Sequence, residues 1–234
     1  MLNPLDNAIS WNLQPHSNMF KNKRVLDLAC HNGDSTRKIK QSGSTSVVGV
    51  DIRSNQINHA ISINQDNDIC YFCNDFTDYN FLDNQVKNAQ VITQFGALYH
   101  MFDHFRFFSH ILKPHIEYVL LETIYGPESS DPEMFWGFEP VDYFLNGWMS
   151  GVNTIPHGSP NLSWIIQSAN IFNFNIDFVE KRYAVTNFKN VTDHETNKRM
   201  VVRLYNSKLF PNIIPLSIDE IWMWNDDNKI FGTI

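Results

Sequence analysis

The sequence predicts an α/β fold in which a mostly parallel sheet carries helices on both faces. Between residues 24 and 123, short apolar runs alternate with helical segments, and this order is typical of parallel βαβ units. The length of 234 residues suits one large domain, and the 43% of apolar residues can bury a core. We therefore expect residues 1–234 to form a single doubly wound domain.

The first half of the chain is expected to supply five strands and the helices between them. Apolar runs predict strands at residues 24–29, 46–51, 68–73, 89–95 and 116–123. Helical segments are predicted at residues 34–43, 53–64 and 101–112. In the second of these helices, Ile57, Ala60 and Ile61 have the spacing of one helical face, so we expect that face to be buried.

The pattern breaks at residues 125–158, where Gly and Pro are frequent among aromatic residues. We expect an insertion over the carboxyl edge of the sheet, where α/β folds bind ligands. Ser159 followed by Pro160 predicts the start of a helix that runs through residues 162–170. Further strands are predicted at 174–183 and 200–206, which make seven, and a hairpin at 221–234 within a C-terminal segment 207–234.

Two interpretations of the insertion's aromatic residues stay open. They can wall a pocket for a planar or apolar substrate, or they can fill a small core beneath a long loop. The residues are Phe135, Trp136, Phe138, Tyr143, Phe144 and Trp148.

Composition excludes several classes of protein. The formal charge is −7, with 18 Lys plus Arg against 25 Asp plus Glu, so general nucleic-acid binding is not expected. Three cysteines cannot form a disulfide framework, and the lead-in at residues 1–22 lacks the layout of a signal peptide. No run approaches the roughly 18 apolar residues that span a bilayer. We expect a cytoplasmic protein without a membrane segment.

The first strand is followed by a turn at residues 27–34, which crosses the ligand crevice of a doubly wound sheet. Asp51 ends the second strand, where a carboxylate can accept hydrogen bonds from ribose hydroxyls. A dinucleotide needs a glycine-rich turn and a helix N-terminus open to its pyrophosphate, but Asp34 would repel an anion there. S-adenosylmethionine (SAM) has a ribose and a cationic sulfonium but no phosphate, so it fits this turn better.

The same segments resemble the motifs of class I SAM-dependent methyltransferases. VLDLACHNGDS (25–35) is similar to their first motif, and VVGVD (47–51) is similar to their second. Residues 74–76 resemble the segment that contacts adenine, and residues 91–114 resemble the fourth motif with its following helix. The resemblance implies a Rossmann-like fold and methyl transfer from SAM to a small-molecule or nucleoside acceptor.

The resemblance also implies a set of cofactor-binding residues. Asp51 would hold the ribose, Asp75 and Phe76 the adenine, and the turn at 29–33 the methionine part. Ala29 and His31 stand where members of the family usually carry glycine. The full set is Asp27, Ala29, Cys30, His31, Gly33, Asp51, Ile52, Asn74, Asp75, Phe76, Gln94 and Tyr99.

Three residues are candidates for the chemistry. The resemblance places Tyr99 beside the sulfonium, where an aromatic face favours a cation. His100 can orient a substrate or accept a proton, or it can simply pack at a helix start. Glu122, which ends the fifth strand, is a second candidate base, or else it pairs with a nearby cation. No metal site is expected, since Cys70 and Cys73 are better explained as core residues.

The nearest branch is the tRNA wobble-uridine 5-oxyacetic acid family, whose members transfer a carboxymethyl group. The similar pieces are Trp11 with Pro15-His16, Leu98-Tyr99-His100, Leu121-Glu122-Thr123 and Ile155-Pro156. The chain starts too close to Trp11 to include the N-terminal extension of those enzymes, so we expect no tRNA recognition of their kind. Ordinary SAM is the expected donor, because residues 11–20, 28–33 and 94–101 contain no Lys or Arg to pair an extra carboxylate. Arg199 or Arg203 could still supply that cation.

Two rival functions stay open. A nicotinamide oxidoreductase could share the fold, although the missing glycines and Asp34 count against it. A methyltransferase fold without activity could serve as a binding protein, and the altered turn with His31 is the best support for that alternative.

Overall fold

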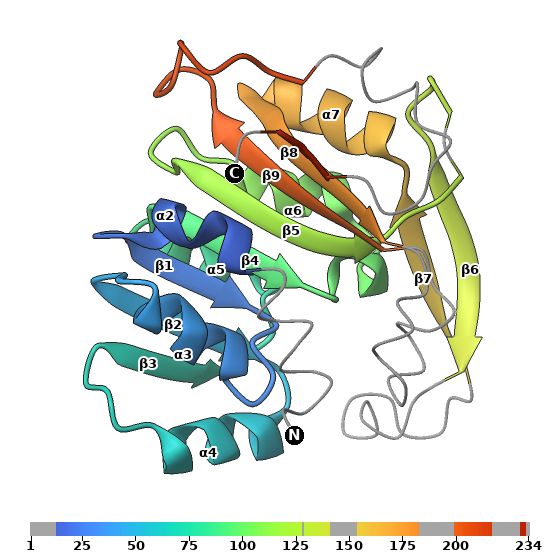
Figure 1. Cartoon of the computed structure of the whole chain (residues 1–234). Coiled ribbons are helices and arrows are strands. Elements are labelled where there is room, and N and C mark those ends of the chain that lie inside the picture. Colours follow the sequence, from blue (N-terminus) through green and yellow to red (C-terminus); the bar gives the residue numbers. More distant parts are fainter. Residues whose placement is uncertain (1–12, 128, 141–153, 183–198, 217–229, 233–234) are drawn as a thin grey trace.

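The computed structural model describes residues 13–127, 129–140, 154–182, 199–216 and 230–232. Their main feature is a sheet of eight strands in the order β10-β8-β9-β5-β4-β1-β2-β3 (Figure 1). The strands are β1 (Arg24–Leu28), β2 (Ser46–Asp51), β3 (Ile69–Cys73), β4 (Val91–Phe95), β5 (Tyr118–Ile124), β8 (Phe174–Arg182), β9 (Arg199–Asn206) and β10 (Ile230–Gly232). The seven predicted strands are all present, and the short β10 adds an eighth.

The strands β1 to β5 run parallel to one another, whereas β9 is antiparallel to both β5 and β8. The apolar strands β1 and β4 lie at the centre, where both faces are covered. The mostly parallel Rossmann-like sheet predicted from the sequence is therefore confirmed.

Helices cover both faces of the sheet. In Figure 1, α2 (Ser17–Phe20) and α3 (Asp34–Gln41) lie in front of the central strands, and α5 (Tyr79–Val86), α6 (His104–Ile111) and α7 (Leu162–Ile171) lie behind them. Each layer has its own apolar core. Phe20 and Ile39 pack on the first face, and Leu82, Phe107 and Ile165 pack on the second. The short η1 (Gln14–His16) precedes α2, and α4 (Ser54–Ile63) joins β2 to β3.

The insertion contains an antiparallel hairpin that the sequence did not predict, formed by β6 (Met134–Pro140) and β7 (Thr154–Pro160). The predicted helix start was also wrong, because Ser159 and Pro160 end β7. Asn161 caps α7 instead, and its side-chain oxygen accepts a hydrogen bond from Trp164 N at 2.8 Å. Asparagine is as good an N-cap as serine, so Ser159 and Asn161 both suit the start of a helix.

Three further expectations need correction. The predicted helix 101–112 begins at His104, because Asp103 caps it, and the sequence prediction overlooked α5. On α4, Ile57 and Ala60 are buried as expected, but Ile61 is 53% exposed. Cys70 and Cys73 are exposed and not in the core, because β3 is the last strand of the sheet. Most of the predicted hairpin at 221–234 lies outside the described residues.

Among the described residues, none of the helices combines the length and the apolar character that crossing a membrane requires.

Candidate cofactor site

The strand order reverses between β1 and β4, since β2 and β3 lie on one side of β1 and β4 and β5 lie on the other. In doubly wound sheets the ligand crevice opens beyond the carboxyl ends of the strands at this reversal. Four segments meet there: the turn after β1, the end of β2, the segment after β4 and the end of β5.

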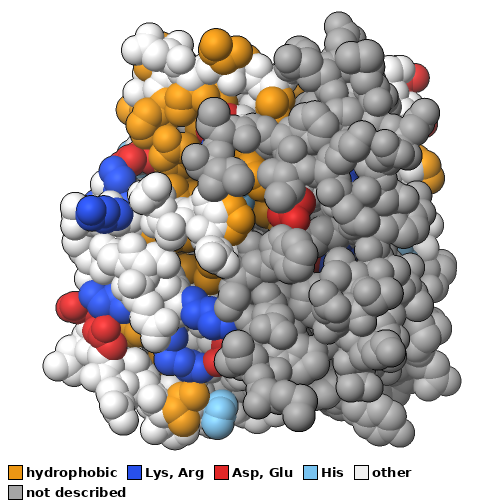
Figure 2. All heavy atoms as spheres, in the orientation of Figure 1, with side chains coloured by type: hydrophobic (Ala, Val, Ile, Leu, Met, Phe, Trp, Pro, Cys, Tyr) orange, Lys and Arg blue, Asp and Glu red, His pale blue; other side chains and the backbone are white. Residues whose placement is uncertain are grey.

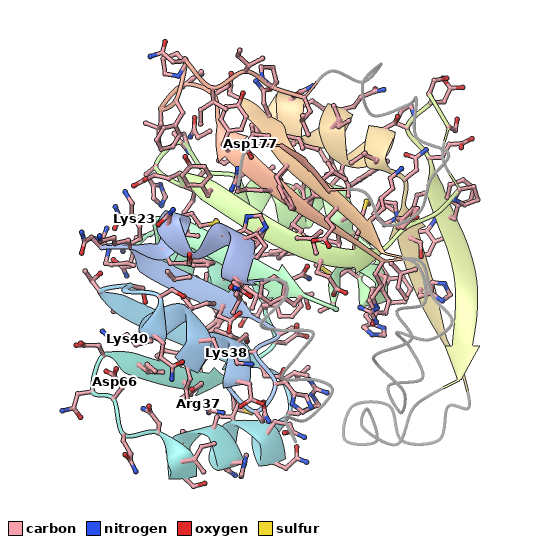
Figure 3. The ribbon with its side chains drawn as sticks, viewed as in Figure 1. Lys23, Arg37, Lys38, Lys40, Asp66 and Asp177 are labelled. Atoms are coloured by element: carbon pink, nitrogen blue, oxygen red, sulfur yellow. The ribbon has the colours of Figure 1, made fainter. Side chains whose placement is uncertain are left out.

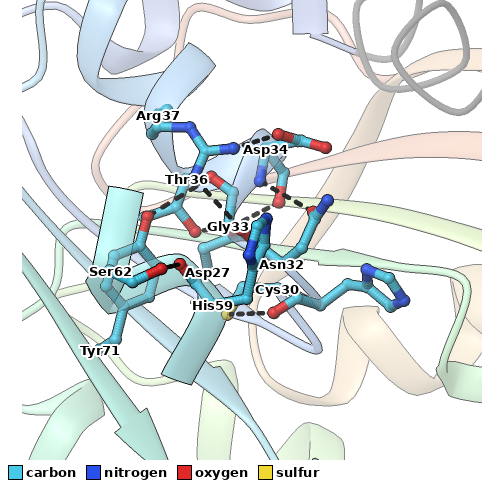
Figure 4. Close-up of polar contacts among 12 residues, drawn as sticks. Asp27, Cys30, Asn32, Gly33, Asp34, Thr36, Arg37, His59, Ser62 and Tyr71 are labelled. Atoms are coloured by element: carbon cyan, nitrogen blue, oxygen red, sulfur yellow. Dashed lines mark hydrogen bonds and ion pairs between the residues drawn. The ribbon is translucent and has the colours of Figure 1, made fainter. Parts of the chain in front are cut away.

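The turn after β1 has an unusual backbone. Ala29, His31 and Gly33 have φ values of 58°, 53° and 81°, all in the left-handed region. This region is natural for glycine and costs other residues on the order of 1 kcal/mol. Ala29 and His31 therefore keep the conformation that glycine would adopt. Gly33 is needed for a second reason, because a Cβ there would lie 2.5 Å from the Tyr71 hydroxyl (Figure 4).

Asp27 lies beneath the turn and is fully buried. Its carboxylate accepts hydrogen bonds from Ser35 Oγ at 2.6 Å, Thr36 Oγ1 at 2.7 Å and Thr93 Oγ1 at 2.8 Å. Burial raises the pKa of Asp27, and the three hydroxyls oppose that shift. These bonds tie β1 to α3 and β4. Asp27 therefore supports the turn, and its assignment to the cofactor stays a prediction.

Cys30 has a buried side chain. Its side chain is 2% exposed, and its backbone N–H donates to Val50 O at 3.0 Å. Burial raises the pKa of the thiol well above its ordinary value, so Cys30 is a small apolar residue of the core at neutral pH.

Asp51 lies at the end of β2 and is 2% exposed. His31 N donates to Oδ2, and Arg53 donates from its backbone N and its Nε to Oδ1 and from Nη2 to Oδ2, each at 2.9 Å. Burial would raise the pKa of Asp51, but the hydrogen bonds and charge of Arg53 outweigh it, and the pKa lies below the ordinary value. Asp51 is therefore ionised and already fully bonded.

The segment predicted to hold adenine lies beside Asp51. Asn74 N donates to Asp51 O at 3.1 Å, which joins the ends of β2 and β3. The half-buried Phe76 packs against Phe107, with ring centroids 5.8 Å apart. Asp75 accepts hydrogen bonds from Thr77. The half-buried Ile52 follows Asp51 on the same edge.

Gln94, near the end of β4, is fully buried. Neither its amide oxygen nor its amide nitrogen has a hydrogen-bond partner among the described residues. A buried amide without partners is costly, and native proteins rarely leave one. Gln94 thus has the chemistry to bind a polar ligand at the crevice, which fits the expected nucleoside cofactor.

Glu122, Arg199 and Tyr99 form a buried cluster, each less than 6% exposed. Arg199 Nη1 lies 2.9 Å and 3.0 Å from the two carboxylate oxygens of Glu122, and Nη2 donates to the Tyr99 hydroxyl at 3.2 Å. Burial would lower the pKa of Arg199, but Glu122 and Tyr99 raise it. The rings of Tyr99 and the half-buried His100 lie 4.1 Å apart. The structure therefore brings the three predicted chemical residues to one edge.

The sequence analysis named Arg199 only as a cation that could reach a carboxylated donor, and it did not predict the contacts of Arg199 with Glu122 and Tyr99. Arg199 is the first residue of β9 and pairs in register with Ile124, the last residue of β5. Only that antiparallel register places it at the carboxyl edge, and one sequence alone contains no signal for the pairing of two strands 75 positions apart.

Aromatic side chains line the rim of this edge. Trp136 on β6 and Phe102 stack with ring centroids 6.1 Å apart, and they are 54% and 58% exposed. His104 lies 6.0 Å from Trp136 and 5.8 Å from Trp164. Of the other predicted aromatic residues, the side chains of Phe138, Tyr143, Phe144 and Trp148 lie outside the described residues.

Residues 25–115 match a family model described as a methyltransferase domain. A SAM-dependent methyltransferase from Mesorhizobium loti is 17% identical, with 86% of this chain and 99% of that chain covered and a TM-score of 0.58. The magnesium protoporphyrin IX methyltransferase of Synechocystis with bound SAM is 13% identical, with 86% and 77% covered and a TM-score of 0.53. The N-terminal domain of EvdMO1 with SAH bound is also 13% identical, with 88% and 82% covered and a TM-score of 0.58. No curated protein matches the chain.

These similarities confirm the expected Rossmann-like fold, and residues 25–115 are the part that is similar to a methyltransferase domain. Two of these neighbours were solved with SAM or SAH bound. The segments predicted to hold the cofactor lie at or near the carboxyl ends of β1, β2, β3 and β4.

Proposed function

We propose that the protein transfers a methyl group from SAM to a small-molecule or nucleoside acceptor. The observation that carries this proposal is the arrangement at the strand reversal, where a left-handed turn, an ionised Asp51 and the partnerless amide of Gln94 lie at the carboxyl ends of neighbouring strands. These groups suit a ligand with ribose hydroxyls and a polar amino-acid end.

The strand order gives each segment a role. Residues 74–76 follow β3 and are suited to the adenine, and Asp51 ends β2 and is suited to the ribose. The amino-acid end then reaches the turn after β1, and the sulfonium comes near Tyr99 after β4. SAM supplies a methyl group that its sulfonium already activates. The residues at this edge orient the donor and the acceptor. Such orientation lowers the activation barrier by up to about 7–11 kcal/mol in favourable cases.

A base is needed only where the acceptor keeps its proton, as a hydroxyl does. Glu122 is occupied by Arg199 and has no open side toward solvent, since it is 3% exposed. His100 is half-buried beside Tyr99 and is the better placed of the two. We therefore assign to His100 the role of the base that takes the proton from the acceptor. The Glu122–Arg199 pair holds the Tyr99 hydroxyl in place.

One observation favours the wobble-uridine alternative. Arg199, which contacts Tyr99, is the cation that a carboxylated donor would need. The surface argues against tRNA, because several basic side chains of the α3 face are paired. Figure 3 labels Lys23, Arg37 and Lys40 among these basic residues. Lys23 Nζ lies 2.6 Å from a carboxylate oxygen of Glu117, Lys40 Nζ lies 2.9 Å from one of Asp68, and Arg37 pairs with Asp34. On the described part of the face in Figure 2, basic and acidic side chains are interspersed. The comparisons give no support for that branch.

Isothermal titration with SAM, SAH and NAD⁺ tests the proposal, followed by transfer of labelled methyl from SAM to panels of nucleosides and small molecules. We expect SAM and SAH to bind and NAD⁺ not to bind. Binding of NAD⁺ alone would favour the oxidoreductase, and SAM binding without any transfer would favour a binding protein. Filter binding with tRNA near physiological salt adds a third test, and sub-micromolar affinity would favour the wobble-uridine alternative.

A further inference from the structure

The hairpin of β6 and β7 lies at the carboxyl edge of the sheet. β7 packs against β5 and against the 3-10 helix η2 (Leu98–His100), which follows β4 (Figure 1). Gly126 N donates to Pro160 O at 3.2 Å, so the end of β7 is joined to the segment just after β5. The hairpin therefore lies beside Tyr99, to which the proposed function assigns the sulfonium.

The two faces of the hairpin carry different side chains, because successive residues of a strand point to opposite sides. Trp136 and Gly158 pair across the hairpin and share one face. A Cβ at Gly158 would lie 2.9 Å from His104 Cε1, so this face packs on the start of α6. The side chain of Trp136 therefore lies on the side of α6, where it stacks with Phe102.

The opposite face of the hairpin carries His157 and Ser159. His157 pairs with Gly137, and Ser159 pairs with Phe135. A Cβ at Gly137 would lie 2.8 Å from His157 Cε1, so only glycine leaves room for the imidazole there. Phe135 lies so close to Gly126 that a Cβ at Gly126 would overlap its ring. This face is therefore turned toward the carboxyl end of β5.

Two polar atoms on this face lack a partner. Ser159 is 5% exposed, and its hydroxyl makes no hydrogen bond to any described residue. The buried Nδ1 atom of His157 likewise makes none within the described part of the chain. Buried polar atoms without bonds are costly, and native proteins rarely keep them unless a ligand or water completes them. The two residues are two positions apart in one strand, so their Cα atoms are about 6.5–7 Å apart.

The charges at this edge indicate which kind of acceptor these two groups suit. A serine hydroxyl and an imidazole both form hydrogen bonds without a permanent charge. Two buried cations at the edge already have partners, since Arg199 Nη1 lies 2.9 Å from Glu122 Oε1 and Lys181 Nζ lies 5.6 Å from the centroid of the Tyr125 ring. An anionic acceptor would have to take one of these cations from its partner. The hydroxyl groups of an uncharged acceptor need no such exchange.

We propose that Ser159 and His157 bind the methyl acceptor, an inference that rests on the proposed function. The acceptor is an uncharged molecule with a hydroxyl group remote from the atom that is methylated, and β7 binds that hydroxyl group. Ser159 and His157 are thereby specificity-determining residues, because they distinguish a polar, neutral acceptor from an apolar or anionic molecule of the same shape.

The experiment compares three phenols of similar shape: 4-hydroxybenzyl alcohol, p-cresol and 4-hydroxybenzoate. Opposite the phenol group they carry a hydroxymethyl group, a methyl group and a carboxylate. Each is titrated calorimetrically into the complex of the protein with SAH. We expect the alcohol to bind the wild type at least fivefold more tightly than either of the others. Ser159→Ala and His157→Phe should each weaken the alcohol at least threefold and change the affinity for p-cresol less than twofold.

Ser163→Ala is the matched control, because it removes another buried hydroxyl group, one that donates to Ser129 O at 2.9 Å. Its affinities for the three phenols should equal those of the wild type, whereas its melting temperature should fall. The melting temperature of Ser159→Ala should not fall, because the lost hydroxyl group makes no hydrogen bond to the described residues of the free protein.

Equal binding of the alcohol by Ser159→Ala and the wild type would overturn the inference. An equal loss for the alcohol and p-cresol would also overturn it, since Ser159 would then only shape the hairpin. The same holds if the SAH complex binds none of the three phenols, or binds p-cresol or 4-hydroxybenzoate more tightly than the alcohol. Wild-type protein that does not bind SAH would overturn the proposed function, a result that titration of SAH alone distinguishes from the others.

Discussion

Arg53 donates to both carboxylate oxygens of Asp51, with Nε 2.9 Å from Oδ1 and Nη2 2.9 Å from Oδ2. With the backbone N–H groups of His31 and Arg53, four donors meet these two oxygens. A carboxylate has about four lone-pair positions, so Asp51 is saturated. Ribose hydroxyls can therefore bind the Asp51 carboxylate only if the Arg53 guanidinium moves away from it. Removal of Asp51 should weaken SAM binding, whereas removal of Arg53 should strengthen it.

Asp51→Ala should weaken SAM binding by roughly 1–3 kcal/mol, because two ribose hydroxyls lose their acceptor. Isothermal titration of SAM measures the loss. Asp68→Ala, at an exposed carboxylate paired with Lys40, controls for the removal of one negative charge. Unchanged affinity in Asp51→Ala would contradict the assignment of the ribose to this residue.

Arg53→Ala should strengthen SAM binding, by about twofold to tenfold, which corresponds to about 0.4–1.4 kcal/mol. The reason is that the variant no longer breaks the Asp51–Arg53 contacts when ribose binds. The same titration measures the gain, and Arg106→Ala, on the surface of α6, serves as the control for removing a guanidinium. Weaker binding in Arg53→Ala would mean that Arg53 itself contacts the donor.

The sequence predicted the sheet well because its strands are apolar runs bounded by turn residues, as in β1 and β2. It also located the turn after β1 and Asp51. It could not show that Asp51 is already bonded by Arg53, since two residues two positions apart can face each other or diverge. It placed the start of α7 two residues early, because Ser159 and Asn161 are both good N-caps.

The cluster around Tyr99 shows a second limit. Tyr99 and Glu122 follow recognisable strands, but Arg199 reaches them through the antiparallel pairing of β9 with β5. Long-range register depends on packing of the whole sheet, not on a local pattern. The exposure of Cys70 and Cys73 has a similar origin, because no local signal marks β3 as the edge strand.

Glu122→Ala should lower the free energy of unfolding by about 3–5 kcal/mol, because it leaves the Arg199 guanidinium buried without its carboxylate. Urea denaturation measures this loss. The double variant Glu122→Leu with Arg199→Leu removes both charges and should recover much of it. A double variant that loses as much free energy of unfolding as the two single variants together would show that Glu122 and Arg199 are not coupled.

The stability of the protein should fall with acid partly through His104. Burial lowers the pKa of this histidine, which lies between Trp136 and Trp164, below its ordinary value of 6.5. The unfolded chain then takes up a proton before the folded chain does, so the free energy of unfolding falls as pH drops below about 6.5 through the folded pKa.

Urea denaturation at pH 7.5 and pH 5.5 checks this effect. The loss between the two pH values should be smaller in His104→Phe, whose ring cannot be protonated. His59→Gln, at an exposed position on α4, should lose as much as the wild type. An equal loss in His104→Phe and wild type would show that His104 does not contribute.

The last prediction concerns the donor. A carboxylated SAM carries an extra carboxylate near the sulfonium, and a buried carboxylate needs a cation. The structure supplies Arg199, whose Nη2 lies 3.2 Å from the Tyr99 hydroxyl, but Glu122 already neutralises it at 2.9 Å and 3.0 Å. A second carboxylate would share one guanidinium with Glu122. We therefore expect ordinary SAM to bind at least as tightly as the carboxylated form.

Competition of the two donors for one labelled ligand measures their affinity ratio. Glu122→Gln makes the test sharper, because it removes the competing charge and leaves a side chain of the same shape. If Glu122 neutralises Arg199 in the wild type, the affinity ratio should shift in favour of the carboxylated donor in Glu122→Gln. A carboxylated donor that binds the wild type tenfold tighter, about 1.4 kcal/mol, would mean that Arg199 serves the donor despite its partner, and that ordinary SAM is the wrong assignment.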